Sequence, residues 1–406
     1  MNAAFRIAWR NLWRHPQRTL LMTVIVAFGS LVILVLFGIV DGFVGSMTAA
    51  HVAEDQGSFQ LRTAAYAADP ALEHALSPEQ LAQLGVALNG MRLAGIAPRL
   101  EAGAMLRSAY GTDGVALRGI DPVAERTVTR LPEMVVAGSY LTGSGEILLS
   151  VALAAELDVR VGERVVVVVS GSAGVKSRGF VTVGLFSPTV VEMERVAVAS
   201  IEDVRELTGV QGATSLAVGL PHGTPSERAV AEARRRLADH PDLEVAGYFD
   251  LNPLARVMIS GSTIKLIPFV IMIGLLAGFG VANTTFYSVV ERTREFGVMR
   301  AVGMSGKTLA GVVLLEATFV GAMGFAIGGG IGYAGLLYFG RNGLDFSSFV
   351  RDVSGSLGMP TVIYAAASGW YWMAAFSVVV FTALVAAWYP ARRANRLEPV
   401  TAIREG

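Results

Sequence analysis

Residues 301–308 form the stretch of the chain that comes nearest to a catalytic motif. Their order, AVGMSGKT, fits a relaxed phosphate-binding loop in which alanine replaces the first glycine. Such a loop joins a buried strand to a helix, so that backbone amides and the lysine surround the phosphates. Here a charged helix is expected before the segment, and no acidic strand that would hold magnesium is apparent. We therefore predict a turn at 303–307 and no nucleotide site.

The remaining reactive side chains form no recognisable catalytic or metal-binding pattern. Cysteine is absent, which excludes thiolate ligands and cysteine nucleophiles. No serine, histidine and carboxylate stand in a nucleophile context, and the histidines lack the spacing of metal ligands. We predict no catalytic residue, no cofactor-binding residue and no metal ligand in this chain. The histidines considered as ligands are His51, His74, His222 and His240.

The composition is that of a membrane protein. Hydrophobic residues make up 53% of the 406 residues and charged residues 16%, whereas about a quarter of the residues in soluble chains are charged. The formal net charge is zero, so no overall basic field would attract nucleic acid, and we predict no nucleic-acid partner. Membrane lipids are the expected surroundings of the apolar segments.

Four apolar stretches are long enough to cross a bilayer, because a hydrocarbon core of about 30 Å needs about 20 residues of helix. The first stretch is longer than the apolar core of a signal peptide, so we expect it to remain as a membrane anchor rather than to be cleaved. The predicted transmembrane helices are 20–42, 261–290, 309–340 and 370–390.

Arginine and lysine residues are concentrated in three of the segments that flank these spans, namely 1–19, 291–308 and 391–406. The positive-inside rule places all three in the cytoplasm. Both termini are then cytoplasmic, 43–260 is a large external domain, and 341–369 is a short external loop. The segment before the first span is expected to be an amphipathic helix, since its paired tryptophans share one helical face beside arginines.

Glu316 lies inside the third predicted span, where a charge is costly and usually faces the interior of a helix bundle. One interpretation makes this carboxylate part of a substrate or coupling route. The other is a structural carboxyl that bonds a neighbouring helix or reaches the interface, because it lies about two turns from the start of the span. The sequence leaves both interpretations open.

The external domain, 43–260, alternates valine-rich runs with helix starts, which is the pattern of an α/β domain. Helices are predicted after Ser77, Ser200 and Thr224, each a hydroxyl residue with a polar partner three positions on. About 200 residues suffice for two compact lobes. The predicted strands are Glu146–Ser150, Arg164–Ser170, Gly179–Phe186 and Arg195–Ala199, with a hairpin connection at 170–178.

The loop 291–303, with the order ERTREFGVMRAVG, resembles the signature that follows the second span in FtsX-like permeases of ABC transporters. This MacB-type family includes MacB and the lipoprotein-releasing permeases LolC and LolE. Within the external domain, 117–122, 138–141 and 146–162 resemble the lipoprotein-releasing branch more than the other branches. Other likenesses in the family's order are AWRNL at 8–12, LEA at 315–317 and YPARRA at 389–394.

The resemblance implies a membrane protein with four transmembrane α-helices and a large α/β extracytoplasmic domain, similar to the MacB periplasmic core, between the first and second helices. It also implies that the loop after the second span couples the chain to a separate ABC ATPase subunit, which would bind ATP and magnesium. Carboxylates and guanidinium groups on a short helix suit such a contact. The expected coupling residues are Glu291, Arg292, Arg294, Glu295, Gly297, Arg300, Ala301 and Gly303.

The function implied is mechanotransmission by a permease subunit of the bacterial inner membrane, with lipoprotein or lipid-related release as the expected task and no enzymatic activity in this chain. A second permease, in a homodimer or heterodimer, and a periplasmic lipoprotein acceptor are further expected partners. The glycine-rich part of the third span, 321–332, suits packing against a second permease or within the chain. Two alternatives stay open, an FtsX-like regulator of a periplasmic cell-wall hydrolase and a ligand-binding membrane receptor.

Overall fold

The structure is a computed structural model, and the residues it describes fall into two units. The helical unit comprises 3–45, 258–345 and 362–396, and the α/β unit comprises 46–257. Altogether, the described residues are 3–171, 174–221, 223–260, 262–345 and 362–396.

Among the described residues of the helical unit, four helices are long and apolar enough to cross a membrane. The first of them starts before the predicted span 20–42 and extends well past it, with Pro16 in the first turn, where its missing amide costs nothing. The helices of this unit are α1 (Ala3–Arg14), α2 (Pro16–His51), α11 (Ser262–Glu291), α12 (Thr293–Ala301), α13 (Gly306–Asn342) and α15 (Gly369–Asn395), and the residues of α2 after 45 belong to the α/β unit.

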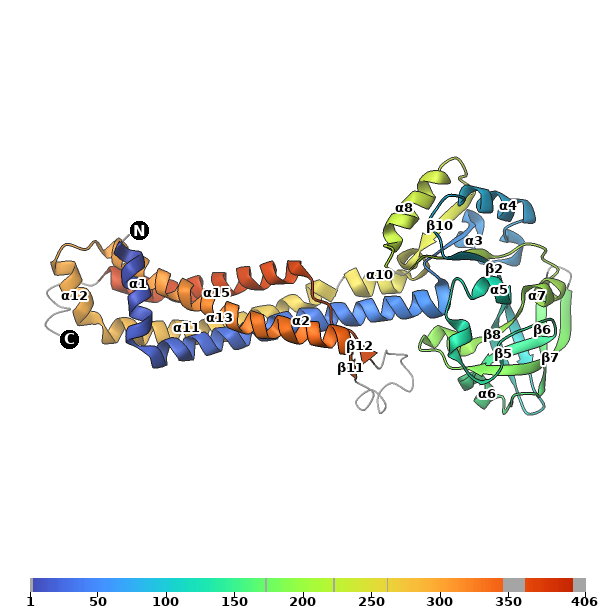
Figure 1. Cartoon of the computed structure of the whole chain (residues 1–406), viewed down its shortest axis with the longest axis horizontal. Coiled ribbons are helices and arrows are strands. Elements are labelled where there is room, and N and C mark those ends of the chain that lie inside the picture. The colour runs from blue at the N-terminus through green and yellow to red at the C-terminus, as the bar shows by residue number, and fades with distance from the viewer. Residues whose placement is uncertain (1–2, 172–173, 222, 261, 346–361, 397–406) are drawn as a thin grey trace. The chain divides into compact units, whose positions relative to one another are not determined.

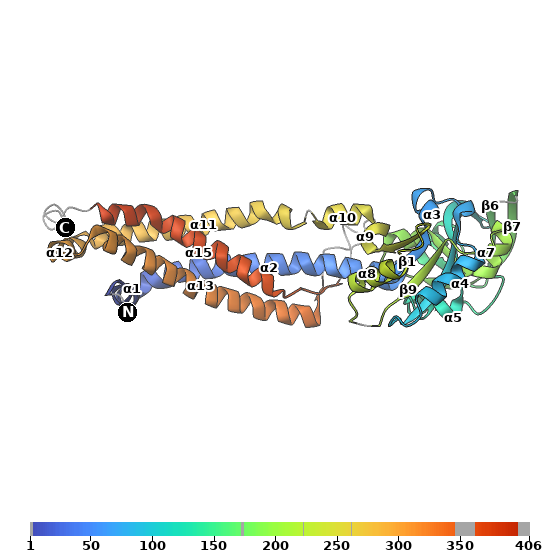
Figure 2. The same cartoon turned by 90° about the horizontal axis from the view of Figure 1, so that it is seen from above.

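Helices α1 and α12 and the last turn of α15 lie at the same end of the helical unit (Figures 1 and 2). The rings of Phe5 and Trp9 on α1 meet the ring of Phe319 on α13 edge-on, with centroids 5.1 and 5.5 Å apart. The described parts of all three segments predicted to be cytoplasmic are therefore at one end of the bundle. A common side of the membrane requires this grouping.

Helix α13 packs closely against α2 through two glycines. A Cβ added at Gly324 would lie 2.6 Å from the Cβ of Val26, and one added at Gly328 would overlap the backbone of Ala27. By contrast, a Cβ at Gly330 would have no neighbour within 4 Å. Of the two interpretations of the glycine-rich span, packing within the chain explains Gly324 and Gly328.

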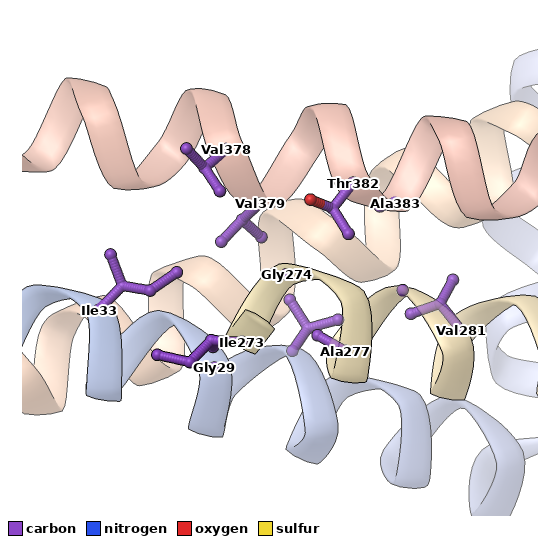
Figure 3. Close-up of a pocket in the computed structure, with 12 residues that line it drawn as sticks. Gly29, Ile33, Ile273, Gly274, Ala277, Val281, Val378, Val379, Thr382 and Ala383 are labelled. Atoms are coloured by element: carbon purple, nitrogen blue, oxygen red, sulfur yellow. The ribbon is translucent and has the colours of Figure 1, made fainter. Parts of the chain in front are cut away.

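Helices α2, α11 and α15 meet around a small apolar pocket (Figure 3). Gly29 of α2 is close to α11, since a Cβ added there would lie 3.6 Å from the Cβ of Ala277. Ile33, Ile273 and Val379 extend toward the same space from the three helices. Small and branched side chains line this pocket, and Thr382 of α15 adds one hydroxyl group to it.

Within the described residues of the α/β unit, a ten-stranded mixed sheet has the order β10-β1-β9-β2-β3-β8-β5-β7-β4, and β6 pairs with β2 and β7. The pairs β3–β8 and β5–β7 are parallel, and the others are antiparallel. The strands are β1 (Phe59–Thr63), β2 (Gly95–Arg107), β3 (Thr112–Ile120), β4 (Val135–Gly138), β5 (Glu146–Ser150), β6 (Arg164–Gly171), β7 (Gly174–Phe186), β8 (Val196–Ser200), β9 (Ser215–Gly219) and β10 (Leu243–Gly247).

Two separate large apolar cores lie on this sheet. One gathers side chains of β2, β3 and β5–β8 with two helices, and is centred on residues such as Leu117 and Phe180. The other gathers β1, β9 and β10 with two more helices, around Phe59 and Leu61. The helices of the unit are α3 (Ala64–Ala68), α4 (Pro78–Ala87), α5 (Pro122–Glu125), α6 (Val151–Glu156), α7 (Ile201–Thr208), α8 (Ser226–Arg236), α9 (Tyr248–Leu251) and α10 (Pro253–Ser260).

Some local predictions for this unit are confirmed and others are wrong. The capping box at Ser77 is present, but the hydroxyl of Ser200 donates to Glu202 instead of capping α7. Helix α8 starts one residue later than predicted, with Pro225 at the N-cap position. The hairpin connection predicted at 170–178 is mostly paired strand, because β6 and β7 continue as a ribbon as far as Gly171 and Gly174.

Candidate functional site

Glu316 is the centre of a buried polar cluster in the helical unit, and its side chain is 8% exposed. The Nδ2 atom of Asn11 donates to Oε1 of this carboxylate at 2.6 Å. Arg292 donates from Nη1 to the same oxygen at 3.2 Å. On the other oxygen, Oε2, Nη2 of Arg18 lies at 3.6 Å. One carboxylate therefore holds two guanidinium groups and one amide.

The cluster joins four separate parts of the helical unit. Asn11 comes from α1, Arg18 from the first turns of α2, and Glu316 from α13. Arg292 is the residue between α11 and α12, and its backbone angles of −100° and 14° interrupt the helix there. The break lets the chain change direction while the Arg292 side chain remains buried against α13. Side chains from α1, α2, α13 and the junction of α11 with α12 therefore meet at one carboxylate.

Arg292 also contacts two residues of α12 itself. Its Nε donates to Oε2 of Glu295 at 3.2 Å, and its guanidinium lies over the ring of Phe296 at 4.9 Å from the centroid. Phe296 is itself buried. The first turn of α12 is thus held by a buried cation, an aromatic ring and a carboxylate at once, a combination that resists rotation of the helix about its own axis.

Arg292, which is buried, and Arg18, which is half-buried, share the buried carboxylate of Glu316, and Arg292 also pairs with the exposed Glu295. The Nη1 atom of Arg18 donates to the hydroxyl of Ser288 on α11. Its Nε is buried without a hydrogen-bond partner. Unpaired donors of this kind are costly in a low-dielectric interior.

The predicted coupling residues divide into a buried and an exposed set. Arg292 and Gly297 are buried, and Arg300 is half-buried because its Nη1 donates to the backbone oxygen of Asn395 at the end of α15, at 2.9 Å. Val298 and Val302 add exposed apolar surface beside the exposed predicted residues. The exposed predicted residues are Glu291, Arg294, Glu295, Ala301 and Gly303.

The segment that matches a phosphate-binding loop is a turn between two helices, as predicted. Gly303 has a φ of 100°, which favours glycine, and the hydroxyl of Ser305 accepts from the amide of Thr308 to cap α13. A Cβ at Gly306 would collide with Arg300 and Asn395. Gly303 thus has a conformational reason and Gly306 a packing reason, and both are independent of nucleotide.

Asn11 and Arg18 belong to the cluster but were missed by the sequence analysis. Asn11 lies in the AWRNL segment, which was recognised only for its family likeness. Arg18 was counted only as one of the cytoplasmic positive charges. The position of Arg18 was a usable signal for this cluster. Arg18 directly precedes a long apolar run and lies a few residues after the amide side chain of Asn11 on the preceding helix.

Residues 267–399 match the family described as FtsX-like permease C-terminal. The chain carries an FtsX-like permease domain. The α12 segment and Glu316 both lie inside the matched region of this permease.

Among curated relatives, the permease is 25% identical over 339 residues to the lipoprotein-releasing system transmembrane protein LolC of Neisseria meningitidis serogroup B, covering 76% of this chain and 77% of the relative. It is 31% identical over 203 residues to the macrolide export ATP-binding/permease protein MacB of Hahella chejuensis, covering 48% of this chain and 28% of the relative. These likenesses agree with the permease domain matched at 267–399.

Among solved structures, the permease is similar to the periplasmic region of MacB from Actinobacillus actinomycetemcomitans, with a TM-score of 0.37 and 12% identity over 50% of this chain and 94% of that one. It is also similar to the extracellular domain of the noncanonic ABC-type transporter YknZ from Gram-positive bacteria, with a TM-score of 0.34 and 14% identity over 47% and 99% of the respective chains.

Proposed function

We propose that this permease passes the motion of a separate ATPase subunit to its α/β unit, and that the work done there is the release of a lipoprotein or related lipidated molecule from the bacterial inner membrane. The observation that carries the proposal is the Glu316 cluster. It connects α12, the expected docking helix, to α1, α2 and α13 through buried charge contacts.

The exposed face of α12 suits a protein partner. Glu291, Arg294 and Glu295 offer charges of both signs, which favour one orientation of a partner over others. Val298 and Val302, 48% and 85% exposed, provide apolar area beside them. A groove lined by these valines and the turn that follows gives the partner a concave surface. In this proposal the partner binds ATP and magnesium, and the permease binds neither.

The buried side of α12 suits transmission. A docked partner that pulls on α12 would load the pair of Arg292 and Glu316 directly, because Arg292 lies at the start of that helix. Leaving a buried charge without its partner costs about 3–5 kcal/mol. The pair would therefore move as one body, carrying α13 and, through Arg18, α2.

Two relatives suggest different cargo. The alignment with LolC covers 77% of that protein, whereas the alignment with MacB covers 28% of that one. The broader match favours lipoprotein release, and transfer to a periplasmic lipoprotein acceptor is part of the proposal. Macrolide export is the second candidate, since the identity to MacB, 31%, is higher over the shared part.

The test is affinity purification of the tagged permease in mild detergent, with an ATPase assay of what is recovered. Val302→Asp places a charge on the exposed apolar face of α12, and Val175→Asp makes the same change at a position of the α/β unit that is 72% exposed. We expect ATPase activity with the wild type and with Val175→Asp, and its loss with Val302→Asp. Full recovery with Val302→Asp would contradict docking on this face.

Cargo is tested on the same preparations. Lipoproteins that co-purify and dissociate on addition of ATP would support lipoprotein release, and macrolide-dependent stimulation of the ATPase would favour export instead. A purification with no ATPase in several detergents would overturn the proposed function as a whole and favour a receptor.

A further inference from the structure

The end of α2 enters the α/β unit as a short π-helical segment, η1 (Val52–Gln56). Such segments are rare and interrupt the regular helix repeat, so they persist where neighbouring contacts hold them. Here the segment and the residue before it, His51, are bound by many different parts of the α/β unit. We call residues 51–56 the α2 joint.

Asp55 is the most strongly held residue of the α2 joint. Its carboxylate accepts a hydrogen bond from Nη2 of Arg118, on β3, at 2.7 Å. Its backbone oxygen accepts one from Nη1 of Arg99, on β2. Two neighbouring strands in the middle of the sheet thus bind one residue at the end of the first long helix. Arg118 also donates to Glu101 at 2.6 Å, which fixes its guanidinium from the other side.

Arg99 is completely buried, with 0% exposure. Its Nε lies 3.1 Å from Oε2 of Glu125, and its Nη2 lies 2.5 Å from Oε1. Glu125 also accepts from the hydroxyl of Thr129 at 2.7 Å. A planar, bidentate pair of this kind has a fixed direction as well as a charge. The guanidinium that binds the α2 joint is therefore itself fixed in orientation.

Further contacts hold the other residues of the α2 joint. Oε2 of Glu54 accepts from the amides of Thr189 at 2.7 Å and Val190 at 3.3 Å. The backbone oxygen of Ala53 accepts from the amide of Arg130 at 2.7 Å. Gln56 accepts at Oε1 from Nδ2 of Asn252 at 2.8 Å. Rotation or withdrawal of the joint would break contacts on several elements together.

The returning segment is held differently. On α10, which leads back to α11, Arg256 pairs with Asp250 at 2.6 Å, but this arginine side chain is 59% exposed. Exposed ion pairs contribute little because water and salt screen them. The contacts of Asp55 are buried or half-buried, whereas this pair on α10 is exposed.

We propose that the α2 joint is the point at which motion enters the α/β unit, and that Arg99 and Arg118 are positioning residues that make the sheet follow the end of α2. The inference rests on the proposed function, because it supposes that α2 is moved from its other end through Arg18. It assigns the main transmission to the first long helix rather than to α11.

The test uses spin labels on the full chain together with its co-purified ATPase, in detergent. The chain has no cysteine, so the background Tyr110→Cys/Tyr338→Cys takes labels only at these two sites, 75% and 62% exposed. The distance distribution between the labels is measured with and without a non-hydrolysable ATP analogue and magnesium. Asp55→Asn is then introduced, with Asp113→Asn as control, since Asp113 also pairs with an arginine, Arg195, but near the surface.

We expect the analogue to shift the distribution in the background protein and in Asp113→Asn. In Asp55→Asn the shift is lost while the ATPase stays bound and hydrolyses ATP at the background rate. A full shift in Asp55→Asn would overturn the inference and leave the proposed function standing. Failure of the background protein to bind an ATPase or to shift would overturn the proposed function, and the inference with it.

A second variant covers the case in which Asp55→Asn does not fold. Ala49→Pro interrupts α2 just before the α2 joint at an exposed position and touches none of the joint's contacts. We expect it to lose the shift while the circular dichroism spectrum and ATPase binding are retained. An undiminished shift in Ala49→Pro would overturn the assignment of α2 as the path of motion.

Discussion

Arg292, at the break between α11 and α12, reaches both oxygens of Glu316 on α13, at 3.2 and 3.5 Å. The pair ties the expected docking helix to the membrane helices, and Arg18 and Asn11 complete it from α2 and α1. The carboxylate that the sequence placed inside an apolar span thus bonds neighbouring helices, as one of its two interpretations required. The same contacts also suit the coupling route of the other interpretation.

Glu316→Gln should destabilise the helical unit. The amide keeps the shape of the side chain, but Arg18 and Arg292 lose their buried counter-charge, and such losses cost about 3–5 kcal/mol. Thermal unfolding of the detergent-purified chain measures the effect through tryptophan fluorescence. Glu73→Gln, at a carboxylate that is 78% exposed, is the matched control and should leave the transition unchanged. Equal transitions for the two variants would argue against a stabilising role of the cluster.

Arg292→Lys separates charge from geometry. Lysine keeps the positive charge but cannot contact Glu316, Glu295 and the Phe296 ring together as the planar guanidinium does. We expect the ATPase to be recovered with this variant and its stimulation by the permease to fall. Arg160→Lys makes the same change at an exposed position of the α/β unit and should behave as the wild type in the same assay. Wild-type stimulation by Arg292→Lys would mean that charge alone suffices.

Gly328→Ala should destabilise the contact of α13 with α2, because the added methyl overlaps the Ala27 backbone. Overpacking of this kind costs about 1–3 kcal/mol. Gly330→Ala introduces the same methyl where nothing lies within 4 Å, and should be neutral or slightly stabilising, since alanine is the better helix former. The two thermal unfolding transitions are compared directly. If Gly328→Ala were as stable as Gly330→Ala, the close approach of the helices would be refuted.

The α/β unit should lose stability in acid through Glu125. Burial alone would raise the pKa of Glu125, but the Arg99 charge and the hydrogen bonds from Arg99 and Thr129 outweigh burial and lower this pKa from its ordinary value of 4.5. Because the pKa is lower in the folded chain than in the unfolded one, the carboxylate stabilises the fold above about pH 4.5. This contribution is lost as the pH falls through the folded-state pKa.

Amide hydrogen exchange of β2, which carries Arg99, measures this acid sensitivity. After correction for the intrinsic pH dependence of exchange, protection in the wild type should decrease below about pH 4.5. Glu125→Gln should show lower protection at neutral pH and a flatter dependence on pH. The prediction fails if the variant retains the full acid dependence of the wild type.

Local features of this fold could be read from the sequence because they depend on neighbouring residues. The capping box at Ser77 needs only Gln80, three positions away, and the strand predicted at Glu146–Ser150 has the bounds of β5. The hairpin predicted around 170–178 is present, but its connection is shorter than predicted, because the glycine and serine content suggested a longer loop. In the structure, ladder contacts across β6 and β7 keep most of these residues in strands.

The sequence by itself was enough to locate the four apolar helices, a turn between α12 and α13, and the segment of α12 that resembles the family signature. These follow from length, hydrophobicity and short-range residue order. Only the tertiary structure decided which charges meet. Asn11 and Glu316 are 305 positions apart, and Asp55 and Arg118 are 63 apart. Contacts at such separations depend on how helices and strands pack, and no local pattern encodes that packing, so the Glu316 cluster and the α2 joint became visible only in the folded chain.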